Sequence, residues 1–262
     1  MNYSILLDVG TAATDATAAV ANSVDLPSLE KIDSLKDAIA ITFFIGYMAM
    51  LASSVFFFVE RGSVDGKWKL SLLVSALITG IAAVHYYYMR EFYMDYGVSP
   101  TALRYVDWTL TVPLMCVEFY LLTKPFGAKG GTLFKLILAS VVMLVTGLLG
   151  ETIFREENVL WGWLSTAGYL YIVYEVFAGD VAKLTKSSNS PALGRAMFLM
   201  KIFITLGWAI YPIGYMVIPG NYLDTILNET YIDLFYNIAD AINKIGFGLV
   251  VYTVAVAESG KK

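Results

Sequence analysis

The chain has 262 residues, of which 58% are hydrophobic and only 15% are charged, and its formal net charge at pH 7 is −4. Soluble domains carry a charge at about 25% of positions, so this composition excludes an ordinary soluble domain and indicates a membrane protein. The single cysteine, Cys116, excludes an intrachain disulfide. We expect neither a metal site nor a nucleic-acid partner.

The first 35 residues are small, polar and acidic. Ala19-Val20-Ala21 has the form of a signal-peptidase site, but Asp8 and Asp15 precede it and no basic segment stands at the amino terminus. We therefore predict an extracellular tail over residues 1–35, with a cleaved signal segment as the less favoured alternative.

Seven apolar runs of roughly twenty residues follow, each long enough to cross a bilayer as a helix. They cover residues 37–58, 69–88, 103–122, 133–150, 159–177, 197–218 and 231–255. Their connections are short, so residues 36–258 are predicted to form one all-α bundle of seven transmembrane helices. The third and seventh spans carry charges, and these must face protein because lipid does not solvate them.

Basic residues in the connections and at the ends of the spans are distributed unevenly between the two sides of the predicted bundle. This asymmetry predicts an amino terminus outside the cell and a cytoplasmic carboxyl terminus, with residues 259–262 as a short cytoplasmic tail. Twelve basic residues lie on the predicted cytoplasmic side and four on the other: Arg61, Lys67, Lys69, Lys124, Lys129, Lys135, Lys183, Lys186, Arg195, Lys201, Lys261 and Lys262 against Lys31, Lys36, Arg90 and Arg155.

The third span, RYVDWTLTVPLMCVEFYLL, contains an arginine, an aspartate and a glutamate. Arg104, Asp107 and Thr111 are three and four residues apart, so they share one helix face. Glu118 follows Asp107 by eleven residues, about three turns or roughly 16 Å, and returns to nearly the same face. This stripe has the geometry of a relay across the membrane. Bridging between helices is the alternative, which four ionisable groups in two spans disfavour.

The seventh span, YNIADAINKIGFGLVVY, places Asp240 and Lys244 one helical turn apart. A desolvated lysine amine is suited to Schiff-base chemistry with an aldehyde. The alternative is a structural ion pair that joins this helix to its neighbour.

RYVDWTLTVP, with EF eleven residues after its aspartate, and YNIADAINK resemble the microbial rhodopsins, and among them the proteorhodopsin group of light-driven proton pumps. The resemblance covers all seven spans and implies an outward proton pump in the bacterial inner membrane. Asp107, Thr111 and Glu118 match the signature of such pumps. A sensory photoreceptor and a light-driven sodium pump are the alternatives: sensory members usually lack a carboxylate at the Glu118 position, and sodium pumps carry Asn-Asp-Gln in the signature.

The resemblance also implies the roles of the buried charges. Lys244 carries all-trans retinal as a protonated Schiff base, Asp107 is the primary proton acceptor and Asp240 is the second counterion. Arg104 supports the counterion pair, and Glu118 is the cytoplasmic proton donor.

A retinal pocket is implied as well, with ordinary packing of aromatic side chains as the alternative. An apolar residue at position 115 resembles the green-absorbing forms, and Tyr215 stands where some relatives have a tryptophan. The implied walls are Trp108, Met115, Trp208, Tyr211, Pro212 and Tyr215.

Two further positions match the family. His85 corresponds to the histidine that is paired with the acceptor aspartate, although it could instead bridge helices or protomers. Gly162 corresponds to an opening where a carotenoid antenna docks in some relatives, or it is a small residue tolerated in helix packing. The family also implies a homo-oligomer of five or six protomers.

Overall fold

The computed structural model describes residues 34–218, 221–223, 226 and 231–260, which are mostly helical and include no strand. Of the predicted extracellular tail only Ser34 and Leu35 are described; the rest of it, like Lys261 and Lys262, lies outside the described residues. The chain divides into two compact units, Met1–Asp37 and Ala38–Lys262, and the second contains the helical bundle.

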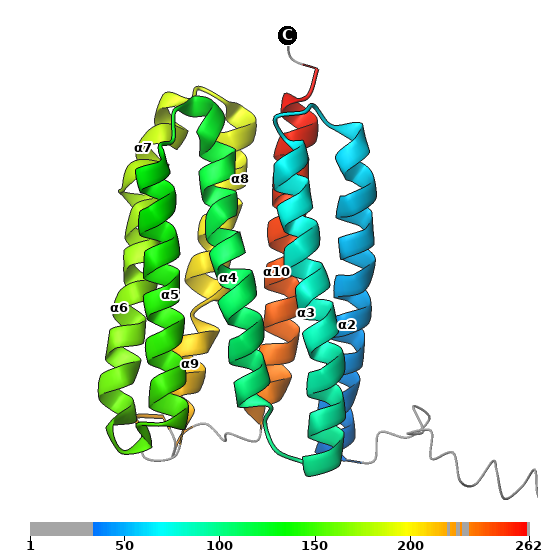
Figure 1. Cartoon of the computed structure of the whole chain (residues 1–262), viewed down its shortest axis with the longest axis vertical. Coiled ribbons are helices and arrows are strands. Elements are labelled where there is room, and N and C mark those ends of the chain that lie inside the picture. Colours follow the sequence, from blue (N-terminus) through cyan, green and yellow to red (C-terminus); the bar gives the residue numbers. More distant parts are fainter. Residues whose placement is uncertain (1–33, 219–220, 224–225, 227–230, 261–262) are drawn as a thin grey trace, which may run out of the picture. The chain divides into compact units, whose positions relative to one another are not determined.

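The bundle is built from long helices that run up and down in chain order (Figure 1). The sixth segment consists of two helices, α8 and α9, joined by a π-helical turn, η4 (Phe203–Gly207). The long elements are α2 (Leu35–Glu60), α3 (Lys69–Tyr96), α4 (Thr101–Thr123), α5 (Gly130–Thr152), α6 (Asn158–Phe177), α8 (Pro191–Ile202), α9 (Ile210–Val217) and α10 (Ile232–Glu258).

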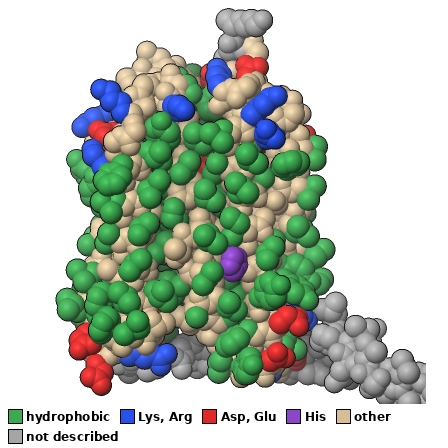
Figure 2. Space-filling view, in the orientation of Figure 1, with side chains coloured by type: hydrophobic (Ala, Val, Ile, Leu, Met, Phe, Trp, Pro, Cys, Tyr) green, Lys and Arg blue, Asp and Glu red, His purple; other side chains and the backbone are tan. Residues whose placement is uncertain are grey.

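By length and composition alone, six helical segments of the described chain could cross a membrane: Leu35–Ser63, Lys69–Tyr96, Thr101–Phe126, Gly130–Thr152, Pro191–Val217 and Ile232–Glu258. The 20-residue helix α6 completes the bundle, and its tryptophans and tyrosines are residue types that favour membrane interfaces. Hydrophobic side chains cover the lateral face in Figure 2, whereas charged ones gather near the two ends. The predicted all-α seven-helix class is confirmed.

Several helices extend beyond the apolar runs that predicted them. α3 continues to Tyr96, eight residues past the predicted end of its span. It ends at Gly97, whose φ of 66° is left-handed and whose N–H donates to the Tyr93 carbonyl at 2.8 Å. Glycine adopts this conformation without a steric penalty, so it is suited to end the helix.

The break in the sixth segment was not predicted from the sequence. The Trp208 N–H donates to the Phe203 carbonyl at 3.0 Å, an i→i−5 bond that defines the π turn. Pro212 has no N–H to bond the Trp208 carbonyl, which instead accepts from Tyr211 at 3.1 Å. The extra residue in the turn rotates the side chains of α9 relative to those of α8.

Short elements fill the connections: η1 (Arg61–Ser63), η2 (Lys124–Phe126), η3 (Arg155–Glu157) and α7 (Asp180–Ser187). The sequence did not predict α7. Its first residue is fixed by the Glu175 carboxylate, which accepts the Asp180 N–H at 2.8 Å. The Lys135 ammonium lies 3.2 Å from the Asp180 carboxylate and lowers the pKa of Asp180.

The polar residues of α4 lie in the interior of the bundle. α4 packs between α3 and α5, and α10 packs against α3 and α8. Asp107, Thr111 and Glu118 have no exposed side-chain surface, and on α10 Asp240 and Lys244 are also buried. The fold therefore brings the polar stripes of the third and seventh spans toward each other.

Candidate functional site

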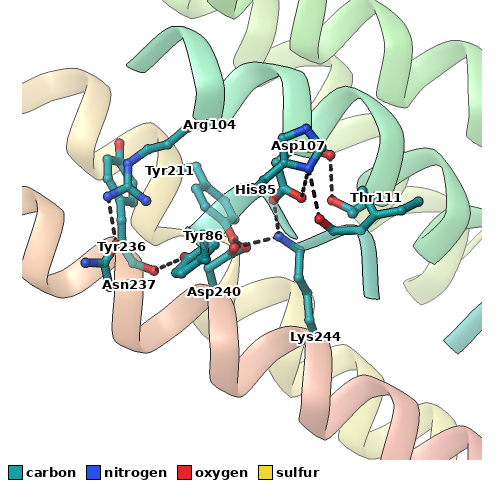
Figure 3. Close-up of polar contacts among 11 residues, drawn as sticks. His85, Tyr86, Arg104, Asp107, Thr111, Tyr211, Tyr236, Asn237, Asp240 and Lys244 are labelled. Atoms are coloured by element: carbon teal, nitrogen blue, oxygen red, sulfur yellow. Dashed lines mark hydrogen bonds and ion pairs between the residues drawn. The ribbon is translucent and has the colours of Figure 1, made fainter. Parts of the chain in front are cut away.

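A buried cluster of one lysine and two aspartates lies between α4 and α10 (Figure 3). Lys244 Nζ is 2.5 Å from Asp107 Oδ2 and 2.5 Å from Asp240 Oδ2. All three residues are at most 2% exposed. Removing one partner of a buried ion pair leaves an uncompensated charge, so both aspartates depend on the ammonium of Lys244.

His85 and Thr111 flank the Asp107 carboxylate in different ways. His85 Nδ1 is 3.7 Å from Asp107 Oδ1 and 2.9 Å from the Ile81 carbonyl. A carbonyl only accepts, so the contact with Ile81 requires a proton on Nδ1. The Thr111 hydroxyl donates to the main-chain carbonyl of Asp107 at 3.0 Å, not to its carboxylate. Of the two, His85 is the one that forms an ion-pair contact with the carboxylate, and it is part-exposed on the lateral face (Figure 2).

Asp240 is held by an aromatic side chain of α9. The Tyr211 hydroxyl donates to Asp240 Oδ1 at 2.8 Å, so one carboxylate oxygen faces Tyr211 and the other faces Lys244. The Tyr211 ring packs against Trp108 at 4.9 Å between centroids and stacks on Tyr236 at 5.9 Å. The side chains of α9 are rotated by the π turn that precedes it, and one of them, Tyr211, contacts the charged cluster directly.

Arg104 bonds to residues of α10 that precede Asp240, the counterion whose support the resemblance implied. Its Nη2 is 2.8 Å from Asp233 Oδ1 and 2.7 Å from Asn237 Oδ1. The guanidinium also lies 5.1 Å from the Phe43 ring and 5.2 Å from the Tyr236 ring. Among the described residues its hydrogen bonds go to these partners and not to Asp107 or Asp240.

Asp233 and Asn237 were not assigned a role from the sequence, although a signal was present. Counting back from Lys244, polar residues recur at Asp240, Asn237 and Asp233, at spacings of four, three and four. Such spacings place all four on one face of α10. This second stripe runs beside the first one on α4.

Glu118 lies apart from the lysine cluster, buried between α4 and α3. Its Oε1 accepts a hydrogen bond from the Ser75 hydroxyl at 2.8 Å, and its Oε2 has no hydrogen-bond partner in the described part of the chain. Ser75 was also missed from the sequence. Ser71, Ser75 and Thr79 recur every four residues in the second span, which is the signal that could have found it.

A pocket opens beside the charged cluster, and nine of the twenty residues that line it are aromatic. The space between protein atoms amounts to about 880 Å³, including its open mouth. The cluster and the pocket share a wall, because Trp108 follows Asp107 and Tyr211 bonds Asp240. Five of the six predicted wall residues line it: Trp108, Trp208, Tyr211, Pro212 and Tyr215.

Met115 is the predicted wall residue that does not line this pocket; it is buried in the hydrophobic core. Lys244 is not part of the lining either, because its amine is directed to the two aspartates. The pocket contains one carboxylate that the sequence did not indicate: Glu151 accepts a hydrogen bond from the Tyr105 hydroxyl at 2.6 Å, and both line the pocket.

Gly162 lines the same pocket, directly against Tyr215. A Cβ built on Gly162 would lie 2.7 Å from Cε1 of Tyr215, closer than side chains approach each other. The Tyr215 hydroxyl donates to the Asn158 carbonyl at 2.8 Å, which fixes the ring in this position. The packing of Tyr215 therefore requires a glycine at position 162, independently of the predicted carotenoid opening.

Comparison with known proteins decides the family. The family model of bacteriorhodopsin-like proteins matches residues 37–257. The chain belongs to the bacteriorhodopsin-like proteins. This bacteriorhodopsin-like chain is 43% identical over 260 residues to the blue-light absorbing proteorhodopsin of gamma-proteobacterium Hot 75m4, with 97% of this chain and 98% of that protein covered.

Solved structures agree with this assignment. The blue light-absorbing proteorhodopsin from Med12 superposes with a TM-score of 0.71 at 41% identity, covering 85% of this bacteriorhodopsin-like chain and 100% of that one. Xanthorhodopsin, described as a light-driven ion pump with dual chromophore, gives a TM-score of 0.75 at 30% identity, covering 86% and 94%. The predicted resemblance is confirmed, and the chain is a multi-pass membrane protein.

Proposed function

We propose that this protein is a light-driven outward proton pump that carries all-trans retinal on Lys244. The observation that supports the proposal best is the buried lysine between two carboxylates, one on its own helix and one on α4. A lysine in this position can hold a positive charge in the interior because carboxylates lie beside it.

The residues present fit retinal, a long apolar aldehyde. Lys244 supplies an amine, the adjacent pocket supplies apolar aromatic walls, and Asp107 and Asp240 supply compensating charge. When bound to Lys244, retinal supplies the absorption of visible light and an isomerisation that moves the lysine nitrogen relative to its neighbours. All further chemistry is proton transfer between side chains.

Asp107 is the better placed of the two aspartates to accept the proton of the Lys244 nitrogen. Asp240 Oδ1 already accepts a hydrogen bond from Tyr211, whereas Asp107 Oδ1 has no hydrogen-bond partner among the described residues and can take a proton. His85, 3.7 Å from that oxygen, shares charge with Asp107 and modulates the transfer.

Glu118 is suited to return a proton to the Lys244 nitrogen from the other side. It is fully buried, and its contact is a neutral hydroxyl, not a cation, so its environment favours the protonated acid. Its position about three turns from Asp107 separates the two transfer steps along the membrane normal. With the carboxyl terminus in the cytoplasm, as the basic residues indicate, the net result is one proton moved outward.

The proposal is tested by light-induced acidification of a suspension of cells that express the protein with added retinal. We expect acidification in both sodium-free and sodium-containing media, abolished by a protonophore and absent in Asp107→Asn. Visible absorbance is expected to be lost in Lys244→Ala. Pigment formation without any light-driven pH change would favour a sensory photoreceptor, and transport that requires sodium would favour a sodium pump.

The remaining parts of the proposal concern the setting of the pump. We propose a location in the bacterial inner membrane, a homo-oligomer of five or six protomers, and a carotenoid antenna seated at Gly162. Xanthorhodopsin is described as having a dual chromophore, and Gly162 lines an open pocket in this chain. Excitation spectra with added hydroxylated carotenoids test the antenna: an absence of energy transfer would refute it.

A further inference from the structure

The outer end of the bundle contains a second buried ion pair, between Arg104 on α4 and Asp233 on α10. Arg104 is 2% and Asp233 5% exposed, and the Nη2 and Oδ1 atoms are 2.8 Å apart. Ser99 donates to the same Asp233 oxygen at 2.8 Å. Asn237 accepts from Arg104 at 2.7 Å and donates to the Thr42 hydroxyl at 2.9 Å. Asp233 is thus held from two sides, and so is the arginine.

This outer pair and the inner cluster lie along the same two helices. Asp233 precedes Asp240 by seven residues, which is two turns or about 10 Å on α10. Arg104 precedes Asp107 by three residues, slightly less than one turn on α4. The Arg104 side chain starts on α4 close to Asp107 and extends outward to Asp233. It is long enough for the guanidinium to approach either carboxylate.

The formal charges of the inner cluster show why the position of the Arg104 guanidinium matters for Asp107. Lys244 carries one positive charge against two aspartates, so the inner cluster has one uncompensated negative charge when all three are ionised. Arg104 forms its ion pair with Asp233 and not with either aspartate of the inner cluster. In a buried site an opposite charge within about 4–6 Å strongly favours the ionised form of an acid. The location of the arginine therefore governs how readily Asp107 holds a proton.

We infer that Asp233 is a positioning residue for the proton acceptor: it holds the Arg104 guanidinium away from Asp107 and thereby sets the pH at which Asp107 changes its protonation state. The inference rests on the proposed function, in which Asp107 is the acceptor. Among the described residues Asp233 bonds Arg104 and Ser99 and not Lys244 or the acceptor, so its route to the acceptor is Arg104.

Other groups around the two carboxylates must be held constant in the test. Asp107 is surrounded by groups from α3 and α10, and Tyr211 of α9 bonds Asp240 beside it. Arg104 and Asp233 are surrounded by groups from α3, α10 and the α3–α4 connection. The groups are His85, Tyr86, Asp240 and Lys244 around Asp107, and Tyr86, Tyr93, Ser99, Tyr236, Asn237 and Asp240 around Arg104 and Asp233.

The experiment is a titration of the dark absorption spectrum of the retinal-loaded protein in lipid nanodiscs, which follows the protonation of the acceptor without any pumping. In Asp233→Asn, Arg104 loses its outer partner and its charge stabilises ionised Asp107. The midpoint of the colour change is expected to move to lower pH by about one unit. Asp233→Glu is expected to restore most of the original midpoint, because the carboxylate is kept.

Two comparisons separate the effect of Arg104 from a general effect of charge. In an Arg104→Gln background, Asp233→Asn is expected to leave the midpoint nearly unchanged, because the group through which it acts is absent. Asp95→Asn removes an exposed carboxylate near the same end of α3 and is expected to have no effect on the midpoint. A shift of equal size in the Arg104→Gln background, or no shift in Asp233→Asn, would overturn the inference.

A failure of Asp233→Asn to yield pigment does not end the test. Ser99→Ala removes one of the two hydrogen bonds to Asp233 and keeps every charge, so we expect a smaller shift in the same direction, and an unchanged midpoint counts against the inference. If the wild-type chain forms no pigment with retinal, the proposed function itself is overturned together with the inference. If it forms pigment and pumps while the variants titrate alike, only the inference is lost.

Discussion

The Ser75→Ala substitution tests the predicted donor through its one hydrogen bond. The Ser75 hydroxyl donates to Glu118 Oε1 at 2.8 Å, and both side chains are buried. In the proposed cycle Glu118 becomes an anion when it gives up its proton, so a donor at Oε1 stabilises the product of that step. Removing the hydroxyl leaves a buried carboxylate oxygen without a partner and makes the transfer less favourable.

The magnitude follows from the difference between two kinds of hydrogen bond. A bond to a charged group contributes about 1.5–3 kcal/mol and a bond between neutral groups about 0.5–1.5 kcal/mol. The hydroxyl therefore stabilises ionised over neutral Glu118 by about 1–1.5 kcal/mol. Because about 1.4 kcal/mol corresponds to a factor of ten in rate, reprotonation of the Lys244 nitrogen is expected to slow about tenfold.

Flash photolysis of the retinal-loaded protein in nanodiscs near neutral pH measures this step as the decay of the deprotonated photocycle state. Ser75→Thr is the matched control, because it keeps a hydroxyl at the same position, and we expect its rate to be close to that of the wild type. A wild-type decay in Ser75→Ala would refute the reasoning. So would an equally slow decay in Ser75→Thr, which would point to packing instead of the hydrogen bond.

Three further outcomes are expected. Glu118→Gln slows reprotonation more than Ser75→Ala does and spares the absorption maximum; an unchanged photocycle would contradict the donor assignment. Tyr211→Phe removes the donor to Asp240 Oδ1 and is expected to destabilise the pigment by about 1–3 kcal/mol, measured as faster thermal bleaching. Gly162→Ala brings a Cβ against Tyr215 and is expected to destabilise the protein by about 1–3 kcal/mol in thermal unfolding; an unaltered midpoint would show that the ring moves freely.

The fold was largely predictable because hydrophobic run length identifies transmembrane helices so directly. Helix ends were less predictable, since a helix continues past the apolar run wherever its backbone remains hydrogen-bonded, as α3 does to Tyr96. The π turn was not predictable. An apolar run such as 197–218 does not encode the hydrogen-bond register, which depends locally on Pro212 and on the packing of α9 against α10.

Within the site, spacing along one helix predicted contacts on that helix, and the family resemblance implied the pairings of Asp107 with Lys244 and His85 on other helices. The partners of Arg104 and Glu118 on other helices were missed. Asp240 and Lys244 are one turn apart, so their pairing follows from the sequence. The partner of Arg104 depends on which residue of α10 faces it, and Asp233 is 129 residues away in sequence. Ser75 is 43 residues from Glu118 in sequence, so a pattern along one helix does not predict this contact either.

The placement of the two aspartates on different helices has a mechanical consequence. Asp240 and Lys244 belong to one rigid helix, so their separation is set by helix geometry and stays nearly constant when α10 shifts or tilts. The separation of Asp107 from Lys244 spans two helices, and any sliding of α4 against α10 changes it directly. Asp240 thus acts as a fixed reference, and Asp107 as the adjustable contact. Conditions that alter the spacing between helices, such as hydrostatic pressure or a thinner bilayer, should change the Asp107–Lys244 distance more than the Asp240–Lys244 distance.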